Sequence, residues 1–163
     1  MEIKSERLVL RKPRQRDKPE LVYHLNNWNV VKWLSYVPYP YAKQDAEYWL
    51  AKVHEEEFNL NIFKEGILVG GMGITLGDQD TYELGYWLGE EFWGNGFITE
   101  AGIALLESTS RVIDSSKLTA TYMKENEASR NVLEKLNFYS SSEGTKYSAS
   151  RKKEMPIVLM KHK

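Results

Sequence analysis

The residues that could do chemistry lie close together in the middle of the chain. Glu83 sits in the alternating segment "TYELGYWL" (residues 81–88), a pattern typical of a β-strand. The turn "WGNG" (residues 93–96) follows, and a helix is predicted from about Ile98 to Ser110. The first turn of a helix has unpaired N–H groups and the positive end of the helix dipole, and glycines let a ligand approach the backbone. This order of features is compatible with an anion site beside a strand that carries a carboxylate.

The glycine turn also has a plain structural interpretation, because a strand-to-helix connection can by itself require glycine. It lacks the third glycine of the dinucleotide fingerprint and the Lys-Ser/Thr pair of a phosphate-binding P-loop. If the turn does bind an anion, a diphosphate suits it, since several N–H bonds made together supply the affinity. The candidate donors are the amides of Trp93, Gly94, Asn95, Gly96 and Phe97.

The first third of the chain predicts one strand and three helical segments. Leu8 and Leu10 share one face of a strand over residues 7–12, and Asp17 offers a helix cap. Pro38 and Pro40 exclude helix and regular strand pairing from the loop at residues 35–41. The predicted helices are residues 17–27, 30–34 and 44–58.

The rest of the chain alternates short strands with two helices. Glu65–Gly66 is a hairpin signal, residues 77–80 form a second turn, and Asn126 caps the last helix. The predicted strands are residues 59–64, 67–75, 81–88, 117–123, 137–144 and 154–161, and the helices are residues 98–110 and 127–136. With no linker and no repeat, we expect one mixed α+β domain that spans residues 1–163.

The composition excludes several classes of function. Hydrophobic residues make up 42% and charged residues 28%, and the net charge of −1 gives no general attraction to nucleic acid or to anionic membranes. No apolar run approaches the roughly 20 residues of a membrane span. Without cysteine there is no disulfide or thiolate site, and His24, His54 and His162 are too far apart to predict a metal site. A cytoplasmic location is expected.

Three motifs, in the same order, resemble those of the GNAT superfamily of N-acetyltransferases. The superfamily signature Q/R-x-x-G-x-G/A corresponds to "EFWGNG" (residues 91–96). The longer stretch "GYWLGEEFWGNGFITEA" (85–101) resembles the "GYWL…WGxGYATEA" of the RimJ/RimL-type branch, named for ribosomal-protein N-terminal acetyltransferases. "SERLVLRKPRQRD" (5–17) is similar to the opening strand of that branch, and "ENEASRNVLEKLNF" (125–138) to its late helix and strand.

Two positions depart from the family pattern. Glu91 stands where the superfamily has Gln or Arg, which leaves backbone contacts intact but adds a negative side chain. Asn137 stands where the family has Gly, and asparagine tolerates the left-handed conformation better than most residues. Neither departure changes the expected fold.

The resemblance implies a GNAT-like fold with a twisted mixed sheet of about six to seven strands and about four flanking helices. Two parallel strands, residues 81–88 and 117–123, would splay apart and hold acetyl-CoA as cosubstrate. The backbone of Tyr86, Trp87 and Leu88 would bond the pantetheine arm as an added strand would. Residues 93–97 would hold the diphosphate. Asn126 matches an asparagine that contacts the cofactor in this family, besides its role as a helix cap.

The resemblance also suggests the groups that move protons. Glu83 is the candidate base, directly or through a water, although an outward-facing strand residue is the alternative. The tyrosine that many members carry seven positions after the asparagine is Leu133 here, which cannot donate a proton. Ser129 is therefore the candidate donor to the leaving thiolate, with a local hydrogen bond as its alternative role. Tyr122 is a weaker alternative.

The acceptor is expected to be a primary amine, either a protein N-terminus or a small amine such as a polyamine or an aminoglycoside. A non-catalytic acyl-CoA-binding module is the competing interpretation, and a monomer or homodimer is expected. Aromatic residues crowd the region that walls the acceptor cleft in this family, although we expect Trp28 and Trp33 mainly to pack the early helices onto the sheet. The other three are Tyr36, Tyr39 and Tyr41.

Overall fold

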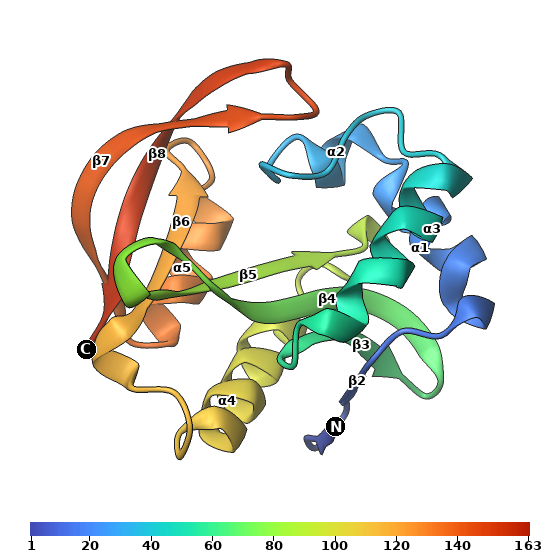
Figure 1. Cartoon of the computed structure of the whole chain (residues 1–163), viewed down its shortest axis with the longest axis horizontal. Helices are drawn as coiled ribbons and strands as arrows, with labels where there is room; N and C mark the ends of the chain where they lie inside the picture. Colours follow the sequence, from blue (N-terminus) through green and yellow to red (C-terminus); the bar gives the residue numbers. More distant parts are fainter.

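The computed structural model describes all residues from 1 to 163 and contains a single eight-stranded sheet (Figure 1). The strand order is β1-β2-β3-β4-β5-β6-β8-β7, and the only parallel pair is β5 with β6. The strands are β1 (Glu2–Lys4), β2 (Val9–Arg11), β3 (Asn59–Lys64), β4 (Ile67–Leu76), β5 (Tyr82–Leu88), β6 (Leu118–Met123), β7 (Phe138–Ser148) and β8 (Lys153–His162). The predicted mixed sheet is confirmed, and β1 is the strand that the sequence did not indicate, because three residues are too few to show alternation.

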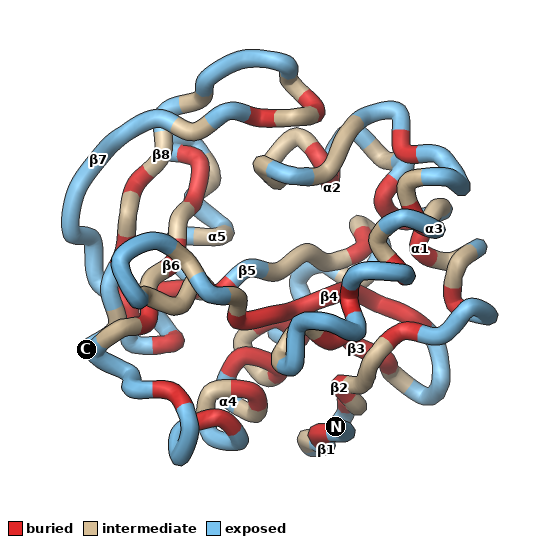
Figure 2. The backbone as a smooth tube through the Cα atoms, viewed as in Figure 1, coloured by how far each residue is buried: buried red, intermediate tan, exposed pale blue.

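Five α-helices flank this sheet, as the five predicted helical segments indicate, against the about four that the family resemblance implies. A buried cluster of 22 residues joins α4 and α5 to one face of the sheet, and a separate cluster of 9 joins the first three helices to the other face. Figure 2 shows the buried backbone along β4, between these two layers. The helices are α1 (Lys18–Leu25), α2 (Trp28–Val31), α3 (Lys43–Lys52), α4 (Phe97–Thr109) and α5 (Glu127–Lys135). None of them combines the length and the apolar character that a bilayer-spanning helix needs.

Turn chemistry follows the sequence closely. Glu65 and Gly66 have φ values of 51° and 79°, as the hairpin between β3 and β4 requires. Asn137 has a φ of 68° at the end of α5, which confirms that asparagine substitutes for glycine there. The side chain of Asn126 accepts a hydrogen bond from the Ser129 N–H at 3.3 Å, so it caps α5 as predicted.

The parallel strands β5 and β6 splay apart after three residue pairs. Pairing runs from Tyr82↔Leu118 to Leu84↔Ala120 and then stops. Beyond that point β5 continues only along β4, and β6 continues only along β8. The expected splay is confirmed, and it leaves one edge of β5 without a neighbouring strand.

The side chains of β5 alternate between the two layers. Leu84 belongs to the core beneath α4, and Tyr82 and Tyr86 pack against the same core. Trp87 packs against the core beneath the first three helices. By the two-residue period of a strand, Glu83 therefore points to the same side as Trp87.

A long hairpin made of β7 and β8 extends from the sheet to α2 (Figure 1). Its tip is fixed there by three hydrogen bonds, from Ser150 Oγ to Val31 O, from Ala149 N to Ser35 O, and from Arg151 Nε to Lys32 O, at 2.9–3.0 Å.

Arg151 also lies close to the rings of Trp28 and Trp33. Its guanidinium lies 5.9 Å from the ring centre of Trp28 and 5.3 Å from that of Trp33. The prediction that these tryptophans mainly pack the helices onto the sheet is therefore wrong. They instead form an aromatic platform for the hairpin tip, and Trp28 stays 38% exposed.

Candidate active site

The glycine turn leads directly into α4. Gly94 and Gly96 have φ values of 79° and 75°, in the left-handed region that side chains with a Cβ avoid. Gly96 is the N-cap of α4, so the turn ends where the helix amides begin. The sequence therefore needs glycine at both positions for a backbone reason, apart from any ligand.

The amides of this turn are open. The backbone N–H groups of residues 94–99 donate no hydrogen bond to any acceptor in the protein. A Cβ placed on Gly94 would meet no atom within 4 Å. A fully buried helix start without partners would be costly, but here Gly94, Asn95 and Gly96 are exposed, and only Phe97 and Ile98 are buried. This arrangement fits a ligand with several anionic oxygens, such as a diphosphate.

Trp93 differs from the other expected donors. Its amide donates to Glu90 O at 3.2 Å, and its indole Nε1 donates to Leu88 O at 2.9 Å. The side chain of Asn95 braces the same turn by donating to Phe92 O at 3.0 Å. These bonds fix the shape of the turn and leave Trp93 without a free amide.

Arg7 places a positive charge beside the turn. Its Nη2 lies 3.7 Å from the position that a Cβ would take on Gly96, and its guanidinium lies 4.7 Å from the ring centre of Phe97. Glu100 holds Arg7 in place, since its Oε2 accepts from Arg7 Nε at 2.6 Å and its Oε1 accepts from Ser5 Oγ at 2.6 Å. Burial would raise the pKa of Glu100, but the hydrogen bonds from Ser5 and Arg7 outweigh it and lower the pKa.

This pair is not among the residues predicted from the sequence. Arg7 and Glu100 both lie within quoted motifs, "SERL" and "ITEA", yet they are 93 residues apart. Nothing local to either motif indicates that the two side chains meet. The one signal in the sequence is that Arg7 and Glu100, in two separate motifs, carry opposite charges.

The direction of the β5 backbone follows from two bonds. Thr119 Oγ1 donates to Tyr82 O at 3.2 Å, so Tyr82 faces β6, whereas the Gly89 N–H donates to Val69 O and so faces β4. Backbone groups alternate along a strand, so even-numbered residues of β5 face β6 and odd-numbered residues face β4.

This alternation separates the three residues expected to bond the pantetheine arm. Tyr86 faces the splay with its N–H and C=O, beyond the last residue pair with β6. Leu88 faces it too, although its carbonyl already accepts from the Trp93 indole. Trp87 turns its backbone toward β4. The open edge therefore consists of Tyr86 and the Leu88 N–H.

Tyr86 and Ser129 meet on the α5 side of the splay. The Tyr86 hydroxyl lies 2.7 Å from Ser129 Oγ and donates to Ser129 O at 3.2 Å. Burial raises the pKa of Tyr86 to about 12, although the hydrogen bond with Ser129 acts in the opposite direction. The phenol therefore stays protonated at neutral pH, and Ser129 has a proton donor beside it.

Leu133, at the family's tyrosine position, and Tyr122, the alternative donor, both lie in the core. Leu133 has no exposed surface, and Tyr122 is 8% exposed among the same core side chains. Of the two proton donors considered from sequence, Ser129 and Tyr122, Ser129 is therefore the partly accessible one.

Glu83 lies on the opposite side of the splay from Ser129 and is held by a lysine that the sequence did not indicate. Lys146 Nζ donates to Glu83 Oε1 at 2.9 Å, and Thr121 Oγ1 lies 3.5 Å from the same oxygen. Glu83 retains 30% of its side-chain exposure. It is thus a partly accessible carboxylate at the point where β5 and β6 separate.

The strand surface next to Glu83 is open. Gly85 is exposed, and a Cβ placed there would meet no atom within 4 Å. It lies on the same side of β5 as Glu83 and Trp87, between the two. Because Gly85 has no side chain, the strand offers a bare backbone surface there. This surface lies beside the Glu83 carboxylate and faces the first three helices.

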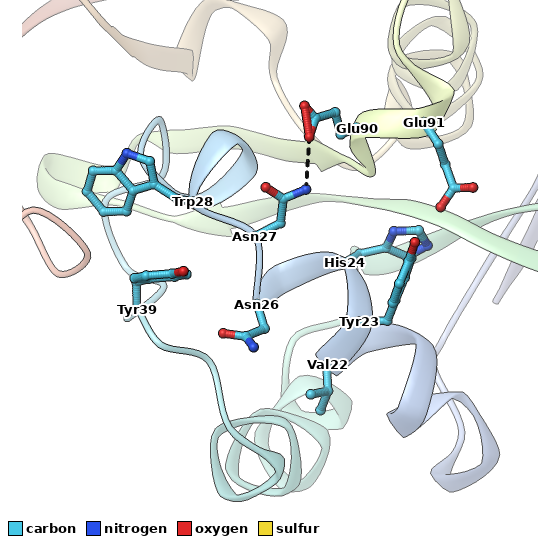
Figure 3. A pocket seen from close by; sticks show the side chains of 9 residues that line it. All are labelled: Val22, Tyr23, His24, Asn26, Asn27, Trp28, Tyr39, Glu90 and Glu91. Atoms are coloured by element: carbon cyan, nitrogen blue, oxygen red, sulfur yellow. Dashed lines mark hydrogen bonds between the residues drawn. The ribbon is translucent and has the colours of Figure 1, made fainter.

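A cavity that the sequence did not indicate lies elsewhere. It measures about 690 Å³ and lies between α1, the start of α2 and the segment that follows β5 (Figure 3). Asn27 Nδ2 donates to Glu90 Oε1 across it at 3.1 Å. It contains neither Glu83 nor the glycine turn, so we do not place the chemistry there. Its lining residues are Val22, Tyr23, His24, Asn26, Asn27, Trp28, Tyr39, Glu90 and Glu91.

The described geometry combines an open amide turn at a helix start, a free strand edge at a splay, and a carboxylate beside that splay. A family model described as an acetyltransferase (GNAT) domain matches residues 7–139. The chain belongs to the GNAT family of acetyltransferases. Membership confirms the expected family and the expected class of enzyme, an acetyl-CoA-dependent N-acetyltransferase.

Relatives and solved structures agree with this family. An uncharacterized N-acetyltransferase, p20 of Bacillus licheniformis, is 26% identical over 143 residues, which cover 82% of this chain and 80% of the relative. A GNAT-family acetyltransferase from Bacillus anthracis superposes with a TM-score of 0.84 at 23% identity, covering 98% of this chain and 96% of that one.

A third similar structure is RimL, a ribosomal L7/L12 α-N-protein acetyltransferase in complex with coenzyme A. It superposes with a TM-score of 0.78 at 19% identity, covering 99% of this chain and 98% of that one. At this identity the likeness concerns the fold. The described residues of this chain include no cluster of three or more His, Cys, Asp or Glu side chains that could hold a metal ion.

Proposed function

We propose that this GNAT protein transfers the acetyl group of acetyl-CoA directly to a neutral primary amine, and that its acceptors are α-amines of protein N-termini. The observation that carries the proposal is the combination of six unpaired amides at residues 94–99 with a partly accessible carboxylate, Glu83, on the adjoining strand. The first group fits an anionic cosubstrate, and the second fits removal of a proton from an amine.

The cosubstrate would be held by backbone more than by side chains. The amides of Gly94, Asn95, Gly96 and Phe97 would bind the diphosphate, with Arg7 adding positive charge beside them. The N–H and C=O of Tyr86 would bond the pantetheine arm along the open edge of β5. Asn126, at the start of α5, would contact the cosubstrate next to Ser129.

The reaction needs two proton movements. The amine nitrogen forms a bond to the thioester carbonyl carbon and loses a proton, and the carbon–sulfur bond breaks to release a thiolate. Glu83 would accept the proton, directly or through a water, on the Gly85 side of the strand. Ser129, hydrogen-bonded to the protonated Tyr86, would supply a proton to the thiolate on the other side.

An α-amine suits this site better than a lysine-like amine. Neutralising an α-amine of pKa 7.7–8.0 at pH 7 costs only about 1 kcal/mol, against about 4.6 kcal/mol for an amine of pKa 10.4. A single carboxylate already paired with Lys146 is a modest base, which is enough for the first and not for the second.

Calorimetric titration with acetyl-CoA and with desulfo-CoA tests the cosubstrate site. We expect both to bind, because the diphosphate and pantetheine contacts do not involve the sulfur. The absence of both binding heat and thermal stabilisation would contradict the proposed site, whatever the acceptor.

A thiol-release assay tests the acceptor. The panel contains peptides with a free α-amine and no lysine, the same peptides with a blocked α-amine and one lysine, spermidine and an aminoglycoside. We expect the free α-amine peptides to be used with the highest kcat/KM. A preference for spermidine or the aminoglycoside would instead assign the enzyme to small amines, and binding without turnover on any amine would indicate an acyl-CoA-binding module.

A further inference from the structure

Lys146 comes from a distant part of the chain and is fixed at the candidate base from two directions. It lies on β7, and its Nζ is 2.9 Å from Glu83 Oε1 on β5. The same Nζ lies 4.9 Å from the ring centre of Tyr36, in the segment after α2. Only 21% of the Lys146 side chain is exposed. The ammonium therefore has a defined position beside the carboxylate.

The rigidity of that position comes from the β7–β8 hairpin. The tip is bonded to residues 31–35, the segment that precedes Tyr36, through Ala149 and Ser150. Lys146 lies only three and four residues before these anchors. Movement of the ammonium away from Glu83 would thus require the hairpin or the long lysine side chain to shift.

The charged and titratable groups that face Lys146 are few. They are Glu83 from β5 and Tyr36 from the segment after α2. Its partner on β8 is the uncharged Met155, and the uncharged Thr121 of β6 contacts the same Glu83 oxygen. Burial would lower the pKa of Lys146, but its hydrogen bonds to Glu83 and Tyr36 outweigh this and raise it. Lys146 therefore remains a cation throughout the neutral range.

We propose that Lys146 is a specificity-determining residue, whose fixed ammonium beside Glu83 favours acceptors that arrive as neutral α-amines over cationic lysine-like amines and polyamines. The inference rests on the proposed function. A second positive charge within about 4–6 Å is disfavoured by the first, so a protonated acceptor is repelled where a neutral one is not. Without Lys146, Glu83 alone would attract cations.

The reference pKa values show why this selects a class of substrate. At pH 7, roughly one α-amine in 6 to 11 is already neutral, whereas only about one lysine-like amine in 2,500 is. A site that excludes the protonated form therefore uses α-amines readily and lysine-like amines hardly at all. A polyamine carries additional positive charges and is excluded more strongly.

The test compares Lys146→Met with Lys146→Arg. Two ratios are measured. Each has kcat/KM for a free α-amine peptide as its numerator, and the denominator is kcat/KM for the blocked peptide with one lysine in the first and for spermidine in the second. We expect Lys146→Met to narrow this preference by about tenfold or more, through a lower KM for spermidine, and Lys146→Arg to retain it.

A second measurement separates charge from structure. With saturating acceptor peptide, kcat reports ionisation in the enzyme–substrate complex. Loss of the Lys146 charge should raise the pKa of the bound amine, so the rising limb of the kcat profile should move to higher pH. Lys153→Met removes an exposed lysine from the same hairpin and should change neither the ratios nor the profile.

Two outcomes would overturn the inference. One is an unchanged preference and an unchanged kcat profile in a folded Lys146→Met protein. The other is an equal effect of Lys153→Met, which would indicate general charge rather than position. If Lys146→Met fails to fold, Lys146→Gln replaces it, with the same two outcomes decisive. Failure of the proposed function is separate, because it appears in the wild-type protein as absent turnover or as a preference for small amines.

Discussion

The two sides of β5 are built in different ways. On the α4 and α5 side, the turn at residues 93–96, the start of α4 and the Asn126 cap are determined by residues a few positions apart. On the other side, Glu83 meets Lys146 across 63 residues, and the hairpin tip meets α2 across 119. Local chemistry thus shapes the amide turn and the helix cap on the proposed cosubstrate side, although Arg7 and Glu100 meet beside the turn across 93 residues. Long-range packing shapes the proposed acceptor side. Substitutions on the α4 and α5 side should therefore change the binding of acetyl-CoA, and substitutions on the other side should change the use of the acceptor amine.

Among the substitutions that test this separation, Glu83→Gln should have the largest effect. The substitution removes the base and keeps the shape, so we expect kcat to fall roughly 100-fold or more. The loss should be largest at low pH, where the acceptor amine is most protonated. Steady-state kinetics from pH 6 to 9, together with calorimetry, would measure both effects.

Glu83→Gln should leave acetyl-CoA affinity within about twofold, because the open amides are not altered. An unchanged pH profile would exclude Glu83 as the base. A matching loss of cosubstrate affinity would contradict the separation of the two sides.

The second test uses two glycines with the same backbone conformation. Gly94 and Gly66 both have a φ of 79°, and an added Cβ meets nothing within 4 Å at either. Replacing each with alanine should therefore cost a similar free energy of unfolding, about 1–2 kcal/mol, because a left-handed residue acquires a Cβ. Only Gly94→Ala should weaken acetyl-CoA binding, by about tenfold, since it alone disturbs the amide turn.

Thermal unfolding and calorimetry on the Gly94 and Gly66 variants would show this difference. Equal effects of the two substitutions on acetyl-CoA affinity would mean that the turn at residues 93–96 only connects the strand to the helix. The acceptor KM should change little in either variant.

These two tests also show what the sequence could and could not predict. The turn and the Asn126 cap follow from glycine and asparagine chemistry within single segments, and both were predicted, whereas the positive φ values of Gly94 and Gly96 are findings of the structure. Lys146 lies in a polar strand with no motif, and its role depends on how a hairpin folds back over β5. The Trp28 and Trp33 prediction was wrong for the same reason, since Arg151 approaches from the far end of the chain.

A third test concerns the link that holds Arg7 beside the turn. The pKa of Glu100 is lowered in the folded protein because its hydrogen bonds from Ser5 and Arg7 outweigh the effect of burial. A carboxyl group with a lowered pKa contributes stability above its ordinary pKa of 4.5 and loses it as the pH falls through the folded-state value. Glu100→Gln should therefore destabilise the protein by about 1–2 kcal/mol at pH 7, a figure reduced for the partly exposed Arg7.

The difference between Glu100→Gln and wild type should shrink below about pH 4.5. Urea unfolding at pH 7, 5 and 3.5 would follow it. A difference that stays constant with pH would mean that packing, and not the charge of Glu100, provides the stability.

The smallest expected effect belongs to Ser129→Ala. A thiolate is a good leaving group, with a conjugate acid of pKa near 8.5, so protonation of it adds little to the rate. Tyr86 would keep a hydrogen-bond acceptor in the Ser129 carbonyl at 3.2 Å, so its ring should not move. We expect kcat to fall about three- to tenfold, with acetyl-CoA affinity and the acceptor KM nearly unchanged.

Tyr86→Phe should give a similar loss if the pair acts as one donor, because Ser129 would then lack its proton source. A 100-fold loss in Ser129→Ala alone would instead mean that expulsion of the thiolate limits the reaction, and that the α5 side carries as much of the chemistry as Glu83 does.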